Sequence, residues 1–174
     1  LAVGFLVCLY LVLRYRVTIV HVRSYTPAVL GLALKKIFGV RFIFDMRGFW
    51  VDARLELGQW GRTSPAYRVA KWLERRFLLE ADVVVALSQG AVDVMRKFPY
   101  LQGKGPRFEV ITVCTNLNIF KPLPQDQQPQ DRMGSGPFTL GYVGNAGPGY
   151  LFDPVLECFK FLKLRRPDAR LLIV

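Results

Sequence analysis

The sequence is poor in the residues that build disulfide frameworks and metal sites. Its 174 residues include three cysteines, Cys8, Cys114 and Cys158, and a single histidine. Three widely spaced cysteines argue against a disulfide scaffold and are typical of a protein from a reducing compartment. One histidine is too few for a zinc site of ordinary composition. We therefore expect a cytoplasmic protein without a metal ion.

Long apolar runs are also missing. The longest, residues 1–13, is shorter than the roughly 20 residues that a membrane-spanning helix needs. It also lacks the basic start and the small-residue cleavage site of a signal peptide. We predict a buried or half-buried helix packed on a sheet, and the remnant of a membrane segment is the alternative. Because the chain starts without Met and stops on the apolar run Leu171–Val174, we expect a fragment cut at both ends.

Acidic residues are scarce beside basic ones. The chain has 24 Lys and Arg residues against 13 Asp and Glu, which gives a formal net charge of +11. Such a charge suits nucleic acid, an anionic membrane surface or a phosphorylated small substrate. The basic residues are spread along the chain without a dense basic arm, so we expect no nucleic-acid partner. A basic solvated surface without a partner is the alternative.

What the chain does have is a regular alternation of strand and helix patterns. Short apolar runs rich in β-branched and aromatic residues recur at residues 18–22, 41–44, 83–87, 108–113, 138–143 and 171–174. Helical patterns lie between most of them, and three of these begin near a proline. Strands that are apolar on both faces are typical of a parallel sheet. The pattern predicts an α/β fold, a Rossmann-like parallel sheet with helices on both faces.

The composition changes sharply at residues 121–137, KPLPQDQQPQDRMGSGP. Four prolines and four glutamines in this stretch cannot form a core element, so we predict an exposed linker. A strand, a helix and a second strand follow it. We therefore expect a first Rossmann-like domain at residues 1–120, with its first strand or strands missing, and the beginning of a second at residues 138–174.

Ligands of an open parallel sheet bind beyond the carboxyl ends of its strands, so the loops after the predicted strands are candidate sites. The richest is DMRGFW, residues 45–50. Arg47 can fork onto a phosphate or carboxylate, and Trp50 can stack on a sugar or base. In the alternative interpretation, Asp45 caps a turn and pairs with Arg47 while the aromatic residues close the edge of the sheet.

Other polar positions have simpler explanations. His21 lies alone on an apolar strand, which favours a core or supporting histidine. Lys71 and Glu74 are three residues apart on a predicted helix, as in a surface ion pair. The closely spaced glycines of residues 141–147 let backbone amides approach a phosphate, although ordinary turns also use glycine.

Taken in order, the segments HVRSY, FIFDMRGFW, KWLERRFLLEADVVVALS, VITVCTNLNIFKP and LGYVG resemble family 4 glycosyltransferases of the GT-B fold. The resemblance implies transfer of a sugar, with retention, from a nucleotide-sugar donor to a cell-envelope, polysaccharide or lipid-linked acceptor, without a metal or other cofactor. It also implies work at the cytosolic face of a membrane. Asn118 stands where the family usually has aspartate. On this interpretation Asp45 is catalytic, Arg23, Arg47, Gly48, Trp50 and Ser88 bind substrate, and Gly144 and Asn145 bind the donor.

The resemblance makes the chain an acceptor-side domain followed by the start of a donor-binding domain. We expect such a fragment to be inactive alone, because catalysis needs the donor positioned against the acceptor. The alternative from another functional class is a non-catalytic basic nucleotide-fold module that docks on a membrane or on a partner protein.

Overall fold

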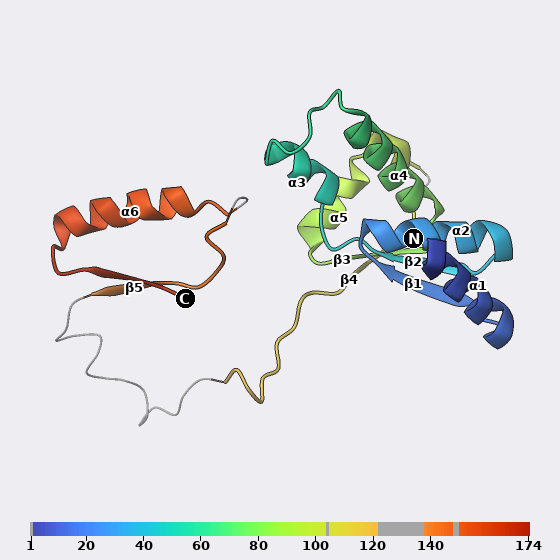
Figure 1. Cartoon of the computed structure of the whole chain (residues 1–174), viewed down its shortest axis with the longest axis horizontal. Coiled ribbons are helices and arrows are strands. Elements are labelled where there is room, and N and C mark those ends of the chain that lie inside the picture. Colours follow the sequence, from blue (N-terminus) through green and yellow to red (C-terminus); the bar gives the residue numbers. More distant parts are fainter. Residues whose placement is uncertain (1, 104, 122–137, 148–149) are drawn as a thin grey trace. The chain divides into compact units, whose positions relative to one another are not determined.

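The structure, a computed structural model, describes residues 2–103, 105–121, 138–147 and 150–174 (Figure 1). The chain divides into two compact units, Leu1–Cys114 and Thr115–Val174, which we describe separately. Apart from Lys121, the predicted linker lies outside the described residues. The bounds of the two domains stay a prediction.

The first unit is built on a four-stranded parallel sheet in which each strand pairs with the next one along the chain. The strands are β1 (Ile19–Arg23), β2 (Arg41–Asp45), β3 (Val83–Ala86) and β4 (Arg107–Val110). In the register, Ile43 lies between His21 and Val83. The predicted Rossmann-like parallel α/β fold is confirmed.

The helices begin and end at the signals that the sequence contains. They are α1 (Ala2–Tyr15), α2 (Tyr25–Phe38), α3 (Trp50–Glu56), α4 (Pro65–Glu80), α5 (Gln89–Arg96) and the 3-10 segment η1 (Pro99–Leu101). Ser64 and Ser88 cap α4 and α5, each accepting a 3.2 Å hydrogen bond from a backbone N–H three residues on. Gly39 ends α2 in the left-handed conformation. Helix α3 was not predicted.

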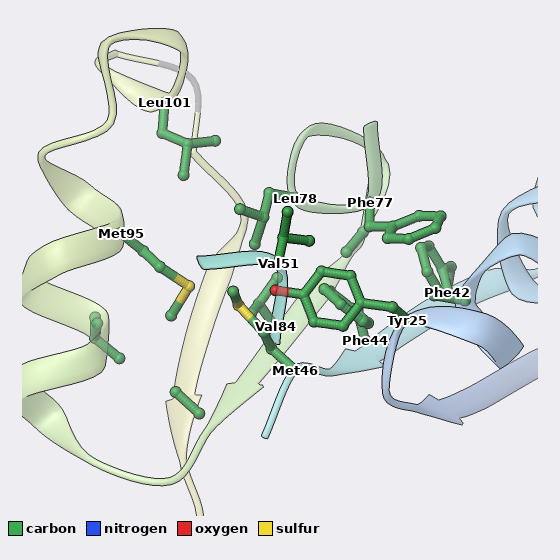
Figure 2. Packing of buried hydrophobic residues seen from close by; sticks show 14 residues of the cluster. Tyr25, Phe42, Phe44, Met46, Val51, Phe77, Leu78, Val84, Met95 and Leu101 are labelled. Carbon is green, nitrogen blue, oxygen red and sulfur yellow. The ribbon is translucent and has the colours of Figure 1, made fainter. Parts of the chain in front are cut away.

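The core lies on one face of the sheet (Figure 2). Phe42, Phe44 and Val84 are fully buried there against Phe77 and Leu78 of α4. Val92 and Met95 of α5 are buried in the same cluster, as the sequence predicts. The sequence predicts helices on both faces of the sheet, and in the part of the chain that the structure describes they pack on this Phe42 face.

Asp82 joins α2 to the sheet at the end of α4. Its Oδ2 accepts hydrogen bonds of 2.7 Å from both the Lys35 ammonium and the backbone N–H of Phe42. Burial alone would raise the pKa of Asp82, but these two hydrogen bonds outweigh it and the pKa is lowered. One carboxylate thus satisfies a strand amide and neutralises a helix cation.

Helix α1 differs from its prediction. Val12 is buried with Leu34 and Val40, but Val3 is 74% and Leu6 61% exposed. The prediction of a buried or half-buried helix is wrong for most of α1, because only one narrow stripe of it reaches α2 and the end of the sheet. None of the described helices has the length and apolar character needed to cross a bilayer.

The second unit contains a strand, a helix and a strand in the predicted order. Strand β5 (Thr139–Tyr142) pairs in parallel with β6 (Arg170–Ile173), and α6 (Phe152–Arg165) connects them. The Tyr142 and Phe152 rings pack with their centroids 5.0 Å apart. Ala169, just before β6, is buried.

Candidate functional site

The loop after β2 is built from two successive three-residue turns. In the first, the N–H of Gly48 donates to the Met46 carbonyl at 2.7 Å around Arg47, which has φ 59°. In the second, the N–H of Trp50 donates to the Gly48 carbonyl at 3.0 Å around Phe49, with φ −83° and ψ 66°. The second turn is a common type, whereas a three-residue turn with positive φ is rare and strained. The loop therefore holds the backbone of Arg47 in a strained conformation. Such strained residues are concentrated at functional sites.

An open pocket of about 560 Å³ lies at the carboxyl ends of the strands, and we call it the Asp45 pocket. Its walls are His21, Arg23, Ile43, Asp45, Arg47, Val85, Leu87 and residues 111–114. The strand register places Arg23 beside Asp45, and His21 is two residues earlier on the same face. Three cationic or titratable side chains thus surround one carboxylate.

Asp45 is the most enclosed polar group of this pocket. Its Oδ2 lies 3.9 Å from both His21 Nε2 and Arg23 Nε, and its side chain is 16% exposed. Among the described residues, its Oδ1 is buried without a hydrogen-bond partner. A buried acceptor left unpaired costs about 1–3 kcal/mol. Because Oδ1 is closed off from solvent, Oδ2, which lies beside His21 and Arg23, is the oxygen that a ligand hydroxyl can approach from the pocket.

A second pocket of about 360 Å³, the Ser88 pocket, lies between the β2 loop and the start of α5. Arg47, Gly48 and Ser88 line it, together with the apolar side chains of Val94 and Met95. Ser88 itself is committed to capping α5 through its bond from Ala91 N. Arg47 belongs to the walls of both pockets, so the loop tip separates them.

The structure places Trp50 away from these two pockets. Its ring lies 5.6 Å from that of Tyr25 and 5.2 Å from that of Trp60, in an apolar hollow of about 270 Å³ between α2, α3 and α4. The Arg54 guanidinium lies 5.1 Å from the Trp50 ring centroid. Of the residues predicted to bind substrate, Arg23, Arg47, Gly48 and Ser88 come together around the loop tip, and Trp50 does not.

His21 is not a core histidine, which was one of the two predicted roles; its position beside Asp45 agrees with the other, a supporting histidine. Its side chain is 59% exposed and forms part of the wall of the Asp45 pocket. The apolar neighbours of His21 in the sequence point to the other face of the sheet, toward the core. A signal was available, because residues two apart on a strand share a face and Arg23 was already a candidate.

The Lys71–Glu74 pair is not on the surface, so the prediction of a surface ion pair is wrong. Glu74 is 1% exposed, and its Oε1 accepts a 2.7 Å hydrogen bond from Lys71 Nζ. Its Oε2 accepts from the Tyr25 hydroxyl at 2.7 Å, and Lys71 also donates to Asp52 Oδ2 at 2.8 Å. Burial, followed by the nearby Glu74 carboxylate, raises the pKa of Tyr25. Burial lowers the pKa of Lys71, but its hydrogen bonds to Asp52 and Glu74 outweigh that effect and raise it.

In the second unit, the candidate donor-binding residues follow β5. The N–H of Gly144 donates to the Val174 carbonyl at 3.2 Å. The side-chain oxygen of Asn145 accepts a 2.8 Å hydrogen bond from Gly147 N, which folds the loop on itself. The Tyr142 hydroxyl donates to the Asn145 carbonyl at 3.0 Å.

Comparison with protein-family models matches residues 4–113 to the glycosyl transferase 4-like domain. The match covers more than half of the chain and contains the Ser88 pocket and every wall residue of the Asp45 pocket except Cys114. No curated protein matches the chain at a significant level.

Proposed function

The chain belongs to the glycosyl transferase 4-like family, and from this premise we propose that it is the acceptor-side part of a retaining glycosyltransferase. The donor is a nucleotide sugar, used as a co-substrate without a metal. The acceptor is a glycan, a polysaccharide or a lipid-linked sugar of the cell envelope. The observation that carries the proposal is the Asp45 carboxylate in the wall of a pocket that Arg23 and Arg47 also line.

Asp45 is proposed to orient the attacking hydroxyl of the acceptor. A hydroxyl that donates to Oδ2 of Asp45 is held in one orientation as the nucleophile. As the acceptor oxygen bonds to the anomeric carbon of the donor sugar, the bond from that carbon to the diphosphate breaks and the nucleoside diphosphate leaves with the electron pair. The hydroxyl proton passes to the Asp45 carboxylate.

Arg23 and Arg47 are proposed to bind an anionic group of a substrate. Both line the Asp45 pocket, and a guanidinium donates two parallel hydrogen bonds to a phosphate or carboxylate. Arg47 also borders the Ser88 pocket, where the first N–H groups of α5 add a partial positive charge. Gly48 gives a substrate room beside the loop, since a β-carbon built there meets no atom within 4 Å. Gly144 and Asn145 are proposed to lie near the donor diphosphate.

The proposal is tested by nucleotide release from the full-length protein. UDP-glucose, UDP-N-acetylglucosamine and GDP-mannose are offered with a bacterial-type polyprenyl-diphosphate sugar or an oligosaccharide mixture, and free UDP or GDP is measured. Asp45→Asn keeps the size of the side chain but removes the carboxylate, so kcat should fall by about 10²–10⁴-fold. Asp93→Asn is the matched control, because Asp93 is exposed and bonded to Gln89 on α5. Undiminished acceptor-dependent release by Asp45→Asn would exclude Asp45 from catalysis.

The cytosolic face of an anionic membrane is proposed as the place where the enzyme meets its acceptor. Residues 1–44 contain six Lys and Arg residues and no Asp or Glu, and the outer side of α1 is apolar. Each basic residue near an anionic surface contributes about 1 kcal/mol to binding. The full-length protein should sediment with phosphatidylserine-containing vesicles and leave them at high salt. Equal binding to neutral phosphatidylcholine vesicles would contradict this part of the proposal.

A further inference from the structure

Among the residues that the structure describes, Glu74 is the one charged residue that is buried. Together with Tyr25, Asp52 and Lys71 it forms one hydrogen-bonded group, which we call the Glu74 network. Its members come from α2, α3 and α4. Burying a carboxylate costs several kcal/mol even when it is paired, and apolar residues of similar volume often stabilise a core as well or better. The network is therefore weakly explained by stability alone.

The network contacts the β2 loop at two points. The Tyr25 hydroxyl has one hydrogen, which it donates mainly to Glu74 Oε2 at 2.7 Å and shares with the Gly48 carbonyl at 3.3 Å. The same carbonyl oxygen accepts from Trp50 N. That carbonyl joins the two three-residue turns of the loop. At the other end, Lys71 holds Asp52 in the first turn of α3.

Between these two contacts, packing also holds the chain, because Val51 is fully buried and the Trp50 ring lies against Tyr25 and Trp60. The positive φ of Arg47 costs about 1–3 kcal/mol, so the turn relaxes unless its surroundings restrain it. The loop is also anchored by Met46, whose N–H donates to the Val85 carbonyl at 3.1 Å. Figure 2 shows Tyr25 in the cluster that it forms with Phe44, Met46 and Val51, which fixes the position of the ring. The buried ring therefore holds the Tyr25 hydroxyl at a fixed position beside the Gly48 carbonyl.

We propose that Glu74 is a positioning residue that holds residues 46–52 in the conformation that presents Arg47 to the two pockets. It acts through the Tyr25 hydroxyl, which it keeps oriented beside the Gly48 carbonyl, and through Lys71, which it shares with Asp52. The inference rests on the proposed function only in taking Arg47 as a substrate-binding residue. The restraint on the loop is a property of the folded chain by itself.

The restraint is tested by amide hydrogen exchange, followed residue by residue with NMR. Tyr25→Phe deletes one hydroxyl, and Glu74→Gln removes the charge while keeping a hydrogen-bonding side chain. In both variants we expect the Gly48 and Trp50 amides, which close the two turns, to exchange at least about tenfold faster. Tyr100→Phe, a partly buried tyrosine in η1, is the control and should leave these rates unchanged.

Two results would overturn the inference. One is unchanged exchange of the Gly48 and Trp50 amides in Tyr25→Phe. The other is a rise of equal size in the amides of β2 and β3, which indicates general destabilisation instead of a local restraint. If Glu74→Gln fails to fold, Tyr25→Phe decides the matter alone, because it removes a single oxygen atom from a core that otherwise keeps its packing.

Transfer assays on the full-length enzyme separate this inference from the proposed function. Faster loop exchange together with a loss of kcat/KM in Tyr25→Phe supports both. Faster loop exchange with full transfer supports the positioning role and refutes the assignment of Arg47 to substrate binding. Lost transfer with unchanged loop exchange overturns the positioning role and leaves the proposed function standing.

Discussion

Helix α2 approaches the sheet most closely at Gly31. A β-carbon built at Gly31 lies 2.8 Å from Cε2 of Phe42 and 2.9 Å from Cγ1 of Val22. Such distances are shorter than any ordinary carbon contact, so Phe42 and Val22 have to move, or α2 has to move away from both. Phe42 is fully buried, and its movement disturbs the centre of the core. We therefore predict that Gly31→Ala destabilises the first unit.

The magnitude follows from two opposing effects. Alanine is favoured over glycine inside a helix by about 1 kcal/mol, whereas overpacking a close-packed core costs about 1–3 kcal/mol. Gly4 in α1 offers a matched control, because a β-carbon there meets its nearest atom, Cδ1 of Leu30, at an ordinary 3.7 Å. Gly4→Ala gains the helix preference without the clash. The difference between the two variants, about 1–3 kcal/mol, therefore isolates the steric cost.

The assay is urea unfolding followed by tryptophan fluorescence. All three tryptophans, Trp50, Trp60 and Trp72, lie in the first unit, so the signal reports on that unit alone. Gly4→Ala should raise the free energy of unfolding, and Gly31→Ala should lower it or leave it unchanged. An equal or higher free energy of unfolding for Gly31→Ala than for Gly4→Ala would refute the reasoning and show that α2 can move away from Phe42 at little cost.

Three further predictions concern other parts of the chain. Asp82→Ala leaves the Phe42 amide unpaired and should cost about 1–3 kcal/mol. Because the pKa of Asp82 is lowered in the fold, its contribution to the free energy of unfolding is present above about pH 4 and is lost as the pH falls further. The urea midpoint of the variant should therefore fall less with acid than that of the parent. Midpoints that fall equally with pH in both proteins would contradict this. Arg47→Lys in the full-length enzyme should lower kcat/KM about tenfold to a hundredfold at an unchanged melting temperature, whereas full activity with a lower melting temperature would make the loop purely structural. Limited proteolysis should cut first within residues 121–137, where the sequence is rich in proline and glutamine, and a first cut inside β3 would contradict the domain assignment.

The sequence predicts the strands well because buried strands consist of short apolar runs rich in β-branched and aromatic residues, which can be recognised directly. All six apolar runs correspond to strands, and only the end of β4 is clearly misplaced, at Val110 instead of Val113. The capping residues Ser64 and Ser88 and the glycine after α2 were equally readable, since each acts through its own backbone neighbours.

The depth of burial could not be predicted in the same way, because it depends on elements that are distant in sequence. The spacing of Lys71 and Glu74 gives their shared side of α4 but not the tyrosine of α2 that covers them. Residues 1–13 are apolar all round, yet in the described structure only one stripe of them packs, against α2 and the end of the sheet. The Asp45 pocket was predicted in part, since the carboxyl ends of parallel strands meet at one edge, but the apolar neighbours of His21 in the chain did not show that its side chain is exposed in the pocket wall.

The order of the strands also sets when the pocket can form. Ile19 pairs with Arg41 and Val83 with Arg107, but Ile43 must find Val83 across the longest intervening stretch of chain, which contains α3 and α4. Closing a longer loop costs more entropy, and pairings between distant residues are slow. The β2–β3 pairing is therefore expected to be the last of the three to close. The Met46 N–H donates to the Val85 carbonyl between the ends of β2 and β3, so this bond forms only when those two strands pair. During folding, β1 is therefore expected to pair with β2 before the loop that positions Arg47 takes its final shape.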